Sequence, residues 1–296
     1  VKNVYKLPAG YAGRFSLGSS KLKIWKWWDL PTLKYNNSLS FEEIIFNVEE
    51  LITKSIKIRL RSDVPLGILL SGGLDSSLIT AIAANILDSK VNTFTFGQSN
   101  SDFDETPYAS IIAKKFDTNH KLLKIDSFDL NPLDELEKFV DEPIADSSII
   151  PTYLISKLAG NHVRVALGGD GGDEIFGGYD SYSSALSLNR YFKFIPQASL
   201  RYLSTIASEF PLGLKGRNKF MSLKEGPFKT HIWGTSFFDV KSRNRLLSSK
   251  MLSEIDNIYS PENILNSFYD LGDNQVENMI RMDIKTKLVD DFLFKV

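Results

Sequence analysis

The stretch that decides the fold is Ser71-Gly72-Gly73-Leu74-Asp75-Ser76-Ser77. It follows an apolar run at 67–70 and precedes a helix-like pattern at 78–83, which predicts a strand that turns sharply into a helix. The two glycines let the backbone approach a ligand closely, because no Cβ is in the way. The first turn of the helix offers unpaired N–H groups and the positive end of the helix dipole, and the serines add hydroxyl donors. The stretch therefore predicts an anion-binding loop, called here the phosphate loop.

Asp75 is the unexpected member of the phosphate loop, since a carboxylate repels a phosphate unless a cation lies between them. The simplest interpretation is a nucleotide phosphate with bound Mg²⁺. The loop lacks the lysine of the common P-loop and the glycine spacing of dinucleotide-binding motifs. The alternative is a serine-rich turn that only caps a helix, but a plain cap needs neither two glycines nor an acid.

A second glycine-rich stretch carries three carboxylates. The run Gly168-Gly169-Asp170-Gly171-Gly172-Asp173-Glu174 follows an apolar segment at 163–167. Open α/β sheets bind ligands where strands meet such loops, at the carboxyl ends of the strands. A crowd of carboxylates is tolerated around a cation or in solvent, so a solvated acidic loop is the alternative. The closely spaced glycines favour a ligand site, because a loop that is only solvated does not need them. We call this stretch the acidic loop.

Strand and helix patterns alternate around both loops. Strands are predicted at 66–70, 92–97, 120–125 and 163–167, with helices at 74–86, 105–117, 132–140 and 150–160. A capping box, Ser40-Phe41-Glu42-Glu43, opens a long amphipathic helix before them. This alternation predicts an α/β protein with a doubly wound parallel sheet. Beyond residue 181 no strand pattern is convincing, and helices are predicted at 182–191, 197–209, 263–271 and 274–294.

Composition limits the classes of function. The chain has 296 residues, of which 43% are hydrophobic, and a net charge of -1, so no nucleic-acid partner is implied. No apolar run approaches the ~20 residues that span a bilayer, and the first residues are no signal peptide, so a cytoplasmic enzyme without a membrane partner is expected. Cysteine is absent, which excludes disulfides, thiolate metal sites and cysteine nucleophiles.

Further motifs accompany the two loops in a fixed order. They are Arg59-Leu60-Arg61-Ser62-Asp63-Val64-Pro65-Leu66-Gly67, Phe94-Thr95-Phe96-Gly97, Asp141-Glu142-Pro143 and Asp146-Ser147-Ser148. With the loops, this set resembles the synthetase domain of bacterial-type, glutamine-dependent asparagine synthetases, strongly over residues 40–185. The resemblance implies a fold of the adenine-nucleotide α-hydrolase or ATP pyrophosphatase type. It also implies three parts: the tail of a glutaminase module and a linker at 1–39, the synthetase core at 40–181, and a helical part at 182–296. The chain is expected to be incomplete at both ends and to lack the glutaminase itself.

The resemblance also implies roles for single residues. The phosphates of ATP would be held by Ser71, Gly72, Gly73, Ser76 and Ser77. Mg²⁺ would be held by Asp75 and Asp173, and this role would make both of them catalytic residues. The adenine would lie between Leu69 and Phe96, and the ribose or adenylate against Gly168 and Gly169, where the family usually has serine at the first position. Asp170 would orient or deprotonate the incoming ammonium, although a structural carboxylate is nearly as good an interpretation.

The implied reaction is an ATP-dependent amide synthesis. A carboxylate, preferably the β-carboxylate of aspartate, would be adenylated, and ammonia from the absent glutaminase would then displace AMP. The alternatives are amidation of another carboxylate such as a sugar acid, lactam formation, a tRNA-modifying or guanylate-forming relative, and a non-catalytic module that retains the fold. A second copy of the chain is a candidate partner.

Overall fold

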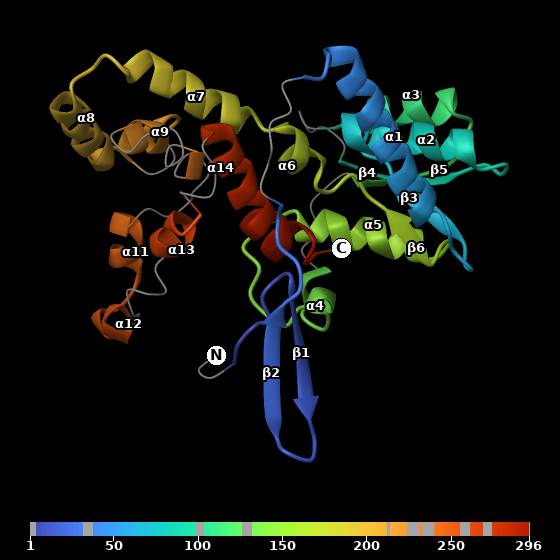
Figure 1. The fold of residues 1–296 in the computed structure, drawn as a ribbon, viewed down its shortest axis with the longest axis horizontal. Coiled ribbons are helices and arrows are strands. Elements are labelled where there is room, and N and C mark those ends of the chain that lie inside the picture. Colours follow the sequence, from blue (N-terminus) through green and yellow to red (C-terminus); the bar gives the residue numbers. More distant parts are fainter. Residues whose placement is uncertain are drawn as a thin grey trace. The chain divides into compact units, whose positions relative to one another are not determined.

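The computed structural model describes residues 4–31, 38–98, 104–125, 132–211, 214–223, 231–232, 240–254, 261–268 and 274–295. Two compact units are present (Figure 1). One comprises Val1–Lys34 and Asp173–Val289, and the other comprises Tyr35–Gly172 and Asp290–Val296. The domain boundaries implied by the sequence, at 39 and 181, stay predictions.

The second unit, here the sheet unit, holds the alternating elements. In chain order these are α1 (Phe41–Arg59), β3 (Leu66–Leu69), α2 (Leu74–Ile86), β4 (Asn92–Gln98), α3 (Thr106–Lys115), β5 (Asn119–Ile125), α4 (Pro132–Leu136), α5 (Ile149–Gly160) and β6 (Val165–Leu167). The strands form a parallel sheet in the order β5-β4-β3-β6, so the predicted α/β fold class is confirmed. The first helix begins with the predicted capping box, in which Ser40 and Glu43 exchange hydrogen bonds.

Alternating side chains of β3 direct the helices to the two faces of the sheet. Ile68 packs with residues of α2, and Leu70, which follows the strand, packs with residues of α3. Leu69 lies in the opposite cluster, with Phe94 of β4 and Ile155 of α5. Because successive strand residues point to opposite faces, α2 and α3 cover one face and α5 covers the other (Figure 1). The sheet is therefore doubly wound.

In the sheet unit, the predicted boundaries of α4 and β6 differ from those in the structure. The helix predicted at 132–140 ends at Leu136, because the N–H groups of Lys138 and Phe139 bond three residues back, which tightens the coil into turns. The strand predicted at 163–167 begins only at Val165. The N–H of Val163 is still bonded to Ala159 of α5, so this residue completes the helix end rather than the sheet.

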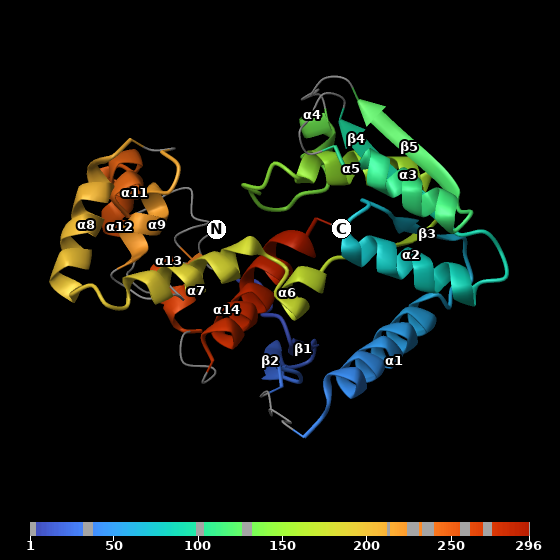
Figure 2. The same cartoon turned by 90° about the horizontal axis from the view of Figure 1, so that it is seen from above.

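The other unit, here the helical unit, combines a hairpin with helices. Its elements are β1 (Tyr11–Ser16), β2 (Lys21–Lys26), α6 (Gly172–Phe176), α7 (Asp180–Phe192), α8 (Gln197–Glu209), α9 (Arg217–Ser222), α11 (Val240–Leu246), α12 (Ser249–Glu254), α13 (Pro261–Asn266), α14 (Gln275–Asp283) and the π-helix η3 (Ile284–Phe292). The last three residues of η3, from Asp290, already belong to the sheet unit. The antiparallel hairpin β1–β2 is almost wholly exposed, and α8 lies beside α9 (Figure 2). After residue 181 the described elements are all helical, as predicted. None of the described helices has the length and apolarity of a membrane span.

Candidate functional site

The phosphate loop rests directly on α3. Gly72 has a φ of +91°, in the left-handed region that favours glycine. A Cβ built at this position would lie 2.5 Å from the backbone nitrogen of Ala109. The residue that caps α2 is Gly73, and no side chain makes a capping hydrogen bond there. The alternative of a serine-capped turn is therefore not supported, whereas both glycines are used for a close turn.

Hydroxyl groups fix the shape of the loop. The Oγ of Ser76 accepts the N–H of Ser71 at 3.2 Å, and the two hydroxyls lie 3.0 Å apart. The Oγ of Ser71 also accepts the N–H of Gly73 at 3.1 Å. Ser76 is 5% exposed, while Ser77 in the same helical turn is half-buried. These bonds hold the first turn of α2 in one position, with its backbone N–H groups at the carboxyl end of β3.

The structure brings the two predicted loops together. Register pairs Ile68 of β3 with Leu167 of β6, so both strands end at one edge of the sheet. A Cβ at Gly169 would lie 3.1 Å from the Cβ of Asp75, and one at Gly172 would overlap the Asp75 carboxylate. The acid of the phosphate loop therefore lies against the glycines of the acidic loop. This contact is the strongest support for a shared site.

Asp170 occupies the space beside Gly168. Its side chain is exposed, and its Oδ2 would be 2.5 Å from a Cβ at position 168. Gly168 leaves room for this carboxylate, because a Cβ at position 168 would overlap the Oδ2 in its present position. The role of Asp170 as a base stays a prediction.

Asp173 lies in the helical unit, whereas Asp75 lies in the sheet unit. Within its own unit, its backbone carbonyl accepts the N–H of Gly178 at 2.9 Å. The neighbouring Glu174 is 1% exposed and accepts the hydroxyl of Tyr179 at 2.6 Å. Burial and this carboxylate raise the pKa of Tyr179 well above its usual value. The joint binding of Mg²⁺ by Asp75 and Asp173 stays a prediction, and the described residues contain no cluster of three or more metal-ligating side chains.

The predicted adenine contacts share one face of the sheet. Leu69 of β3 and Phe96 of β4 are half-buried on neighbouring strands. Both pack against the cluster formed by Phe94, Ile155, Ala159 and Val163. They lie near the strand ends that carry the phosphate loop, which agrees with an adenine site, although no observation tests that role.

The chemistry of these donors fits a magnesium nucleotide. Glycines let the backbone approach the anion, a helix N-terminus and hydroxyls supply donors, and Asp75 offers the hard oxygen that Mg²⁺ prefers. A Cβ at Gly73 would meet only the Oγ of Ser71, at 3.2 Å, so this side of the loop is open.

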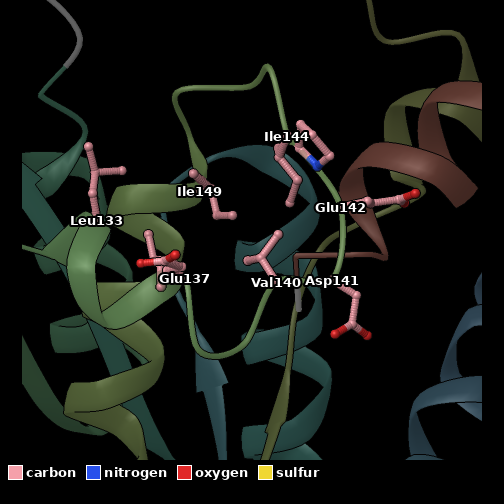
Figure 3. A pocket seen from close by; sticks show the side chains of 9 residues that line it. Leu133, Glu137, Val140, Asp141, Glu142, Ile144 and Ile149 are labelled. Carbon is pink, nitrogen blue, oxygen red and sulfur yellow. The ribbon is translucent and has the colours of Figure 1, made fainter. Parts of the chain in front are cut away.

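A pocket of about 370 Å³ lies at the start of α5. Its walls are Leu133, Leu136, Glu137, Val140, Asp141, Glu142, Pro143, Ile144 and Ile149. Figure 3 shows Val140 and Ile149 facing the space, while the carboxylates of Asp141 and Glu142 point away from it. The pocket contains none of the predicted site residues, but its size lies at the lower end of the range for small-molecule sites.

The sequence does not predict the charged cluster around Lys295. Lys295, with a side chain 4% exposed, forms an ion pair with Asp146 and bonds the hydroxyl of Ser148 at 2.8 Å. The sequence singles out the motif around Asp146, but no pattern in the sequence joins it to a lysine 149 positions later.

Comparisons with known proteins agree with the motifs. The family model described as asparagine synthase matches residues 47–295. The chain is 32% identical, over its whole length, to the protein named "Putative asparagine synthetase (glutamine-hydrolyzing) 2" of Methanocaldococcus jannaschii and spans 56% of that protein. It is 35% identical, over 60% of its length, to asparagine synthetase (glutamine-hydrolyzing) 1 of Bacillus subtilis and spans 28% of it. In a solved structure, the NH3-dependent NAD synthetase of Campylobacter jejuni, the match covers 68% of this chain and 100% of that one, with a TM-score of 0.33 and 18% identity.

Proposed function

Because this chain belongs to the asparagine synthase family, we propose that it uses ATP to convert a carboxylate into an amide. The observation that carries the proposal is the contact between Asp75 and the glycines of the acidic loop, at the carboxyl edge of the sheet. That contact supports one nucleotide site built from both loops. The chain spans about half of the Methanocaldococcus relative, so the activity of the whole protein is part of the proposal.

The phosphate loop would bind the β and γ phosphates. Its backbone N–H groups and the hydroxyls of Ser71, Ser76 and Ser77 would donate to them, with Gly72 and Gly73 allowing the close approach. Asp75 and Asp173 would hold Mg²⁺, which neutralises charge on the departing pyrophosphate. Leu69 and Phe96 would flank the adenine, while Gly168 and Gly169 would lie against the ribose or adenylate.

The first step is attack of the carboxylate on the α phosphorus, which releases pyrophosphate. Ammonia then attacks the acyl carbon of the adenylate, the bond to AMP breaks, and the amide remains. Asp170 is exposed beside the acidic loop and would take the proton that the attacking nitrogen loses. The steps need no protein nucleophile, so the chain's contribution is positioning and charge compensation.

The proposed acceptor is the β-carboxylate of aspartate. Ammonia would come from a glutaminase domain, as the glutamine-hydrolyzing relatives suggest. This chain has no cysteine to attack a glutamine amide, so on its own it would release no glutamate from glutamine. Sugar acids and lactam-forming substrates remain the alternative acceptors.

The test is acceptor-dependent AMP release. The natural protein would be given ATP, Mg²⁺ and ammonium with aspartate, glutamate or a sugar acid, and AMP and the amide would be measured. Formation of the amide with aspartate supports the proposal. Formation of an amide only with another carboxylate would mean that this carboxylate, and not aspartate, is the acceptor. ATP binding without AMP release from any carboxylate would leave the non-catalytic module as the explanation.

Two acid variants test the metal. Asp75→Asn and Asp173→Asn should each abolish AMP formation and the Mg²⁺ dependence of ATP binding, because each would remove one carboxylate from the ion. Asp88→Asn is the matched control, since Asp88 is an exposed acid that follows α2. If Asp75→Asn or Asp173→Asn folds and keeps near-normal turnover, the two carboxylates do not bind Mg²⁺ together.

A further inference from the structure

The buried ammonium of Lys295 is held by oxygen atoms of two separate chain segments. It forms an ion pair with Asp146, a hydrogen bond to the Oγ of Ser148 at 2.8 Å, and an ion pair with Asp291 at 3.0 Å. The ring of Phe292 lies 4.7 Å from the ammonium. An ammonium has three N–H donors, of which two are used in hydrogen bonds to Asp146 and Ser148, while Asp291 adds a second negative charge close by. All of these residues belong to the sheet unit.

The carboxylate of Asp146 has hydrogen-bond donors besides Lys295. Its carboxylate accepts the backbone N–H of Ser148 at 3.0 Å and the hydroxyl of the same residue at 2.7 Å. Burial opposes ionisation of Asp146, but the bonds from Lys295 and Ser148 outweigh it and lower its pKa to about 2. The carboxylate is therefore charged at neutral pH, and the lysine is its counter-ion.

This network anchors the loop that precedes α5, residues 137–148, called here the pocket loop. The loop supplies six of the nine residues that line the pocket of about 370 Å³ (Figure 3). Apart from turns near its two ends, the loop has no regular structure of its own between α4 and α5. The bonds from Lys295 reach it immediately before α5, so they fix one end of the pocket wall.

The topology puts the pocket loop at the ligand edge of the sheet. The helix α5 packs on β4 and leads through a short link into the start of β6. Because β6 is parallel to β3, α5 must run back from the carboxyl edge to the amino edge. Its first turn, and the pocket loop before it, therefore lie at the same edge as the phosphate loop.

We propose that Lys295 is a positioning residue that locks the pocket loop, and that this loop forms the subsite for the carboxylate acceptor. The second half of this inference rests on the proposed function. The phosphate loop keeps its shape through bonds among Ser71, Gly73 and Ser76, none of which involves the pocket loop. Loss of the bonds from Lys295 should therefore weaken the binding of the carboxylate acceptor and leave the binding of ATP unchanged.

The experiment compares Lys295→Met, Lys295→Arg and Lys90→Met in the natural, full-length protein. Methionine keeps the length of the side chain without its charge, and arginine restores a cation. Lys90 is the matched control, because it pairs with Asp117 in the same unit at an exposed position. Each variant would be measured by amide hydrogen exchange of the peptide that covers 137–148 and by the KM values for aspartate and ATP.

We expect Lys295→Met to speed exchange in the pocket loop and to raise the KM for aspartate about tenfold or more, with the KM for ATP changed by less than about twofold. Lys295→Arg should recover part of both effects, and Lys90→Met should match the wild type. Unchanged exchange in Lys295→Met would overturn the lock. Faster exchange with an unchanged KM for aspartate, or an equal loss for both substrates, would overturn the acceptor subsite. If the wild type forms no amide, the proposed function and the acceptor subsite fall, and the exchange experiment still decides whether Lys295 locks the loop.

Discussion

Replacement of Gly72 by alanine should damage both the stability of the sheet unit and its binding of ATP. The residue has a φ of +91°, which a residue with a Cβ adopts at a penalty of about 1–2 kcal/mol. The new Cβ would lie 2.5 Å from the backbone nitrogen of Ala109 and 2.9 Å from the Cβ of Tyr108. Neither atom is the end of a flexible side chain, so the loop or α3 must move. Overpacking of this kind adds about 1–3 kcal/mol.

The two contributions together predict a loss of about 2–5 kcal/mol in the free energy of unfolding. Native domains have about 5–15 kcal/mol in total, so the variant should be clearly destabilised but still folded in many conditions. If the loop moves instead of α3, the stability loss will be smaller and the loss of ATP affinity larger, because the N–H groups of α2 will no longer face the phosphates. Urea unfolding and titration with Mg-ATP measure the two effects separately.

Gly160→Ala is the matched control for this prediction. Gly160 is the last residue of α5, and a Cβ built there has no neighbour within 4 Å. Alanine in place of a helical glycine should be neutral or stabilise by up to about 1 kcal/mol. A Gly72→Ala protein as stable as the Gly160→Ala protein, with unchanged ATP affinity, would refute the reasoning about the loop.

Three further predictions concern single contacts. Gly168→Val should displace the carboxylate of Asp170 and lower the amidation rate more than the affinity for ATP, which steady-state kinetics would detect. The pKa of Asp146, lowered to about 2, contributes stability that is complete above its unfolded value near 4 and is lost as the pH falls between them. On the order of 2 kcal/mol of stability should therefore separate the wild type from Asp146→Asn at neutral pH and vanish near pH 2 in urea titrations. Tyr179→Phe removes the hydroxyl that donates to buried Glu174 and should lower the free energy of unfolding by about 1–3 kcal/mol, whereas an unchanged value would mean that another group satisfies the carboxylate.

The sheet could be predicted from the sequence because its signals are local. Short apolar runs alternate with amphipathic segments, and the four predicted strands are the four strands of the parallel sheet. The errors fall where local patterns continue but the hydrogen bonds change. Bonds to the residue three back end α4 early, and the end of α5 takes Val163 away from β6. At 274–294 the spacing of the apolar residues predicts a helix, but this spacing does not distinguish α14 from the π-helix that follows it.

The meeting of the two loops could also be predicted, whereas their surroundings could not. Parallel strands end at one edge, so loops after β3 and β6 must approach each other. The contact of Gly72 with α3 and the ion pair of Lys295 with Asp146 join residues that are far apart in the sequence. No period or motif encodes such pairs, because they depend on how the helices are placed in three dimensions.

The position of Asp75 has a simple explanation that must be weighed against the metal. An acid in the first turn of a helix stabilises it by about 0.3–1 kcal/mol through the dipole, without any ligand. The interaction with the dipole places no demand on the neighbouring loop, yet the half-buried Asp75 side chain lies against Gly169 and Gly172, where no larger residue would fit. The dipole explains why the carboxylate is tolerated, but not why a second glycine-rich loop lies against it. A role limited to the dipole predicts that Asp75→Asn loses a little stability and keeps the Mg²⁺ dependence of ATP binding, whereas a metal ligand predicts the reverse. The close contact with these glycines is therefore the reason to expect that Asp75→Asn fails in binding rather than in folding.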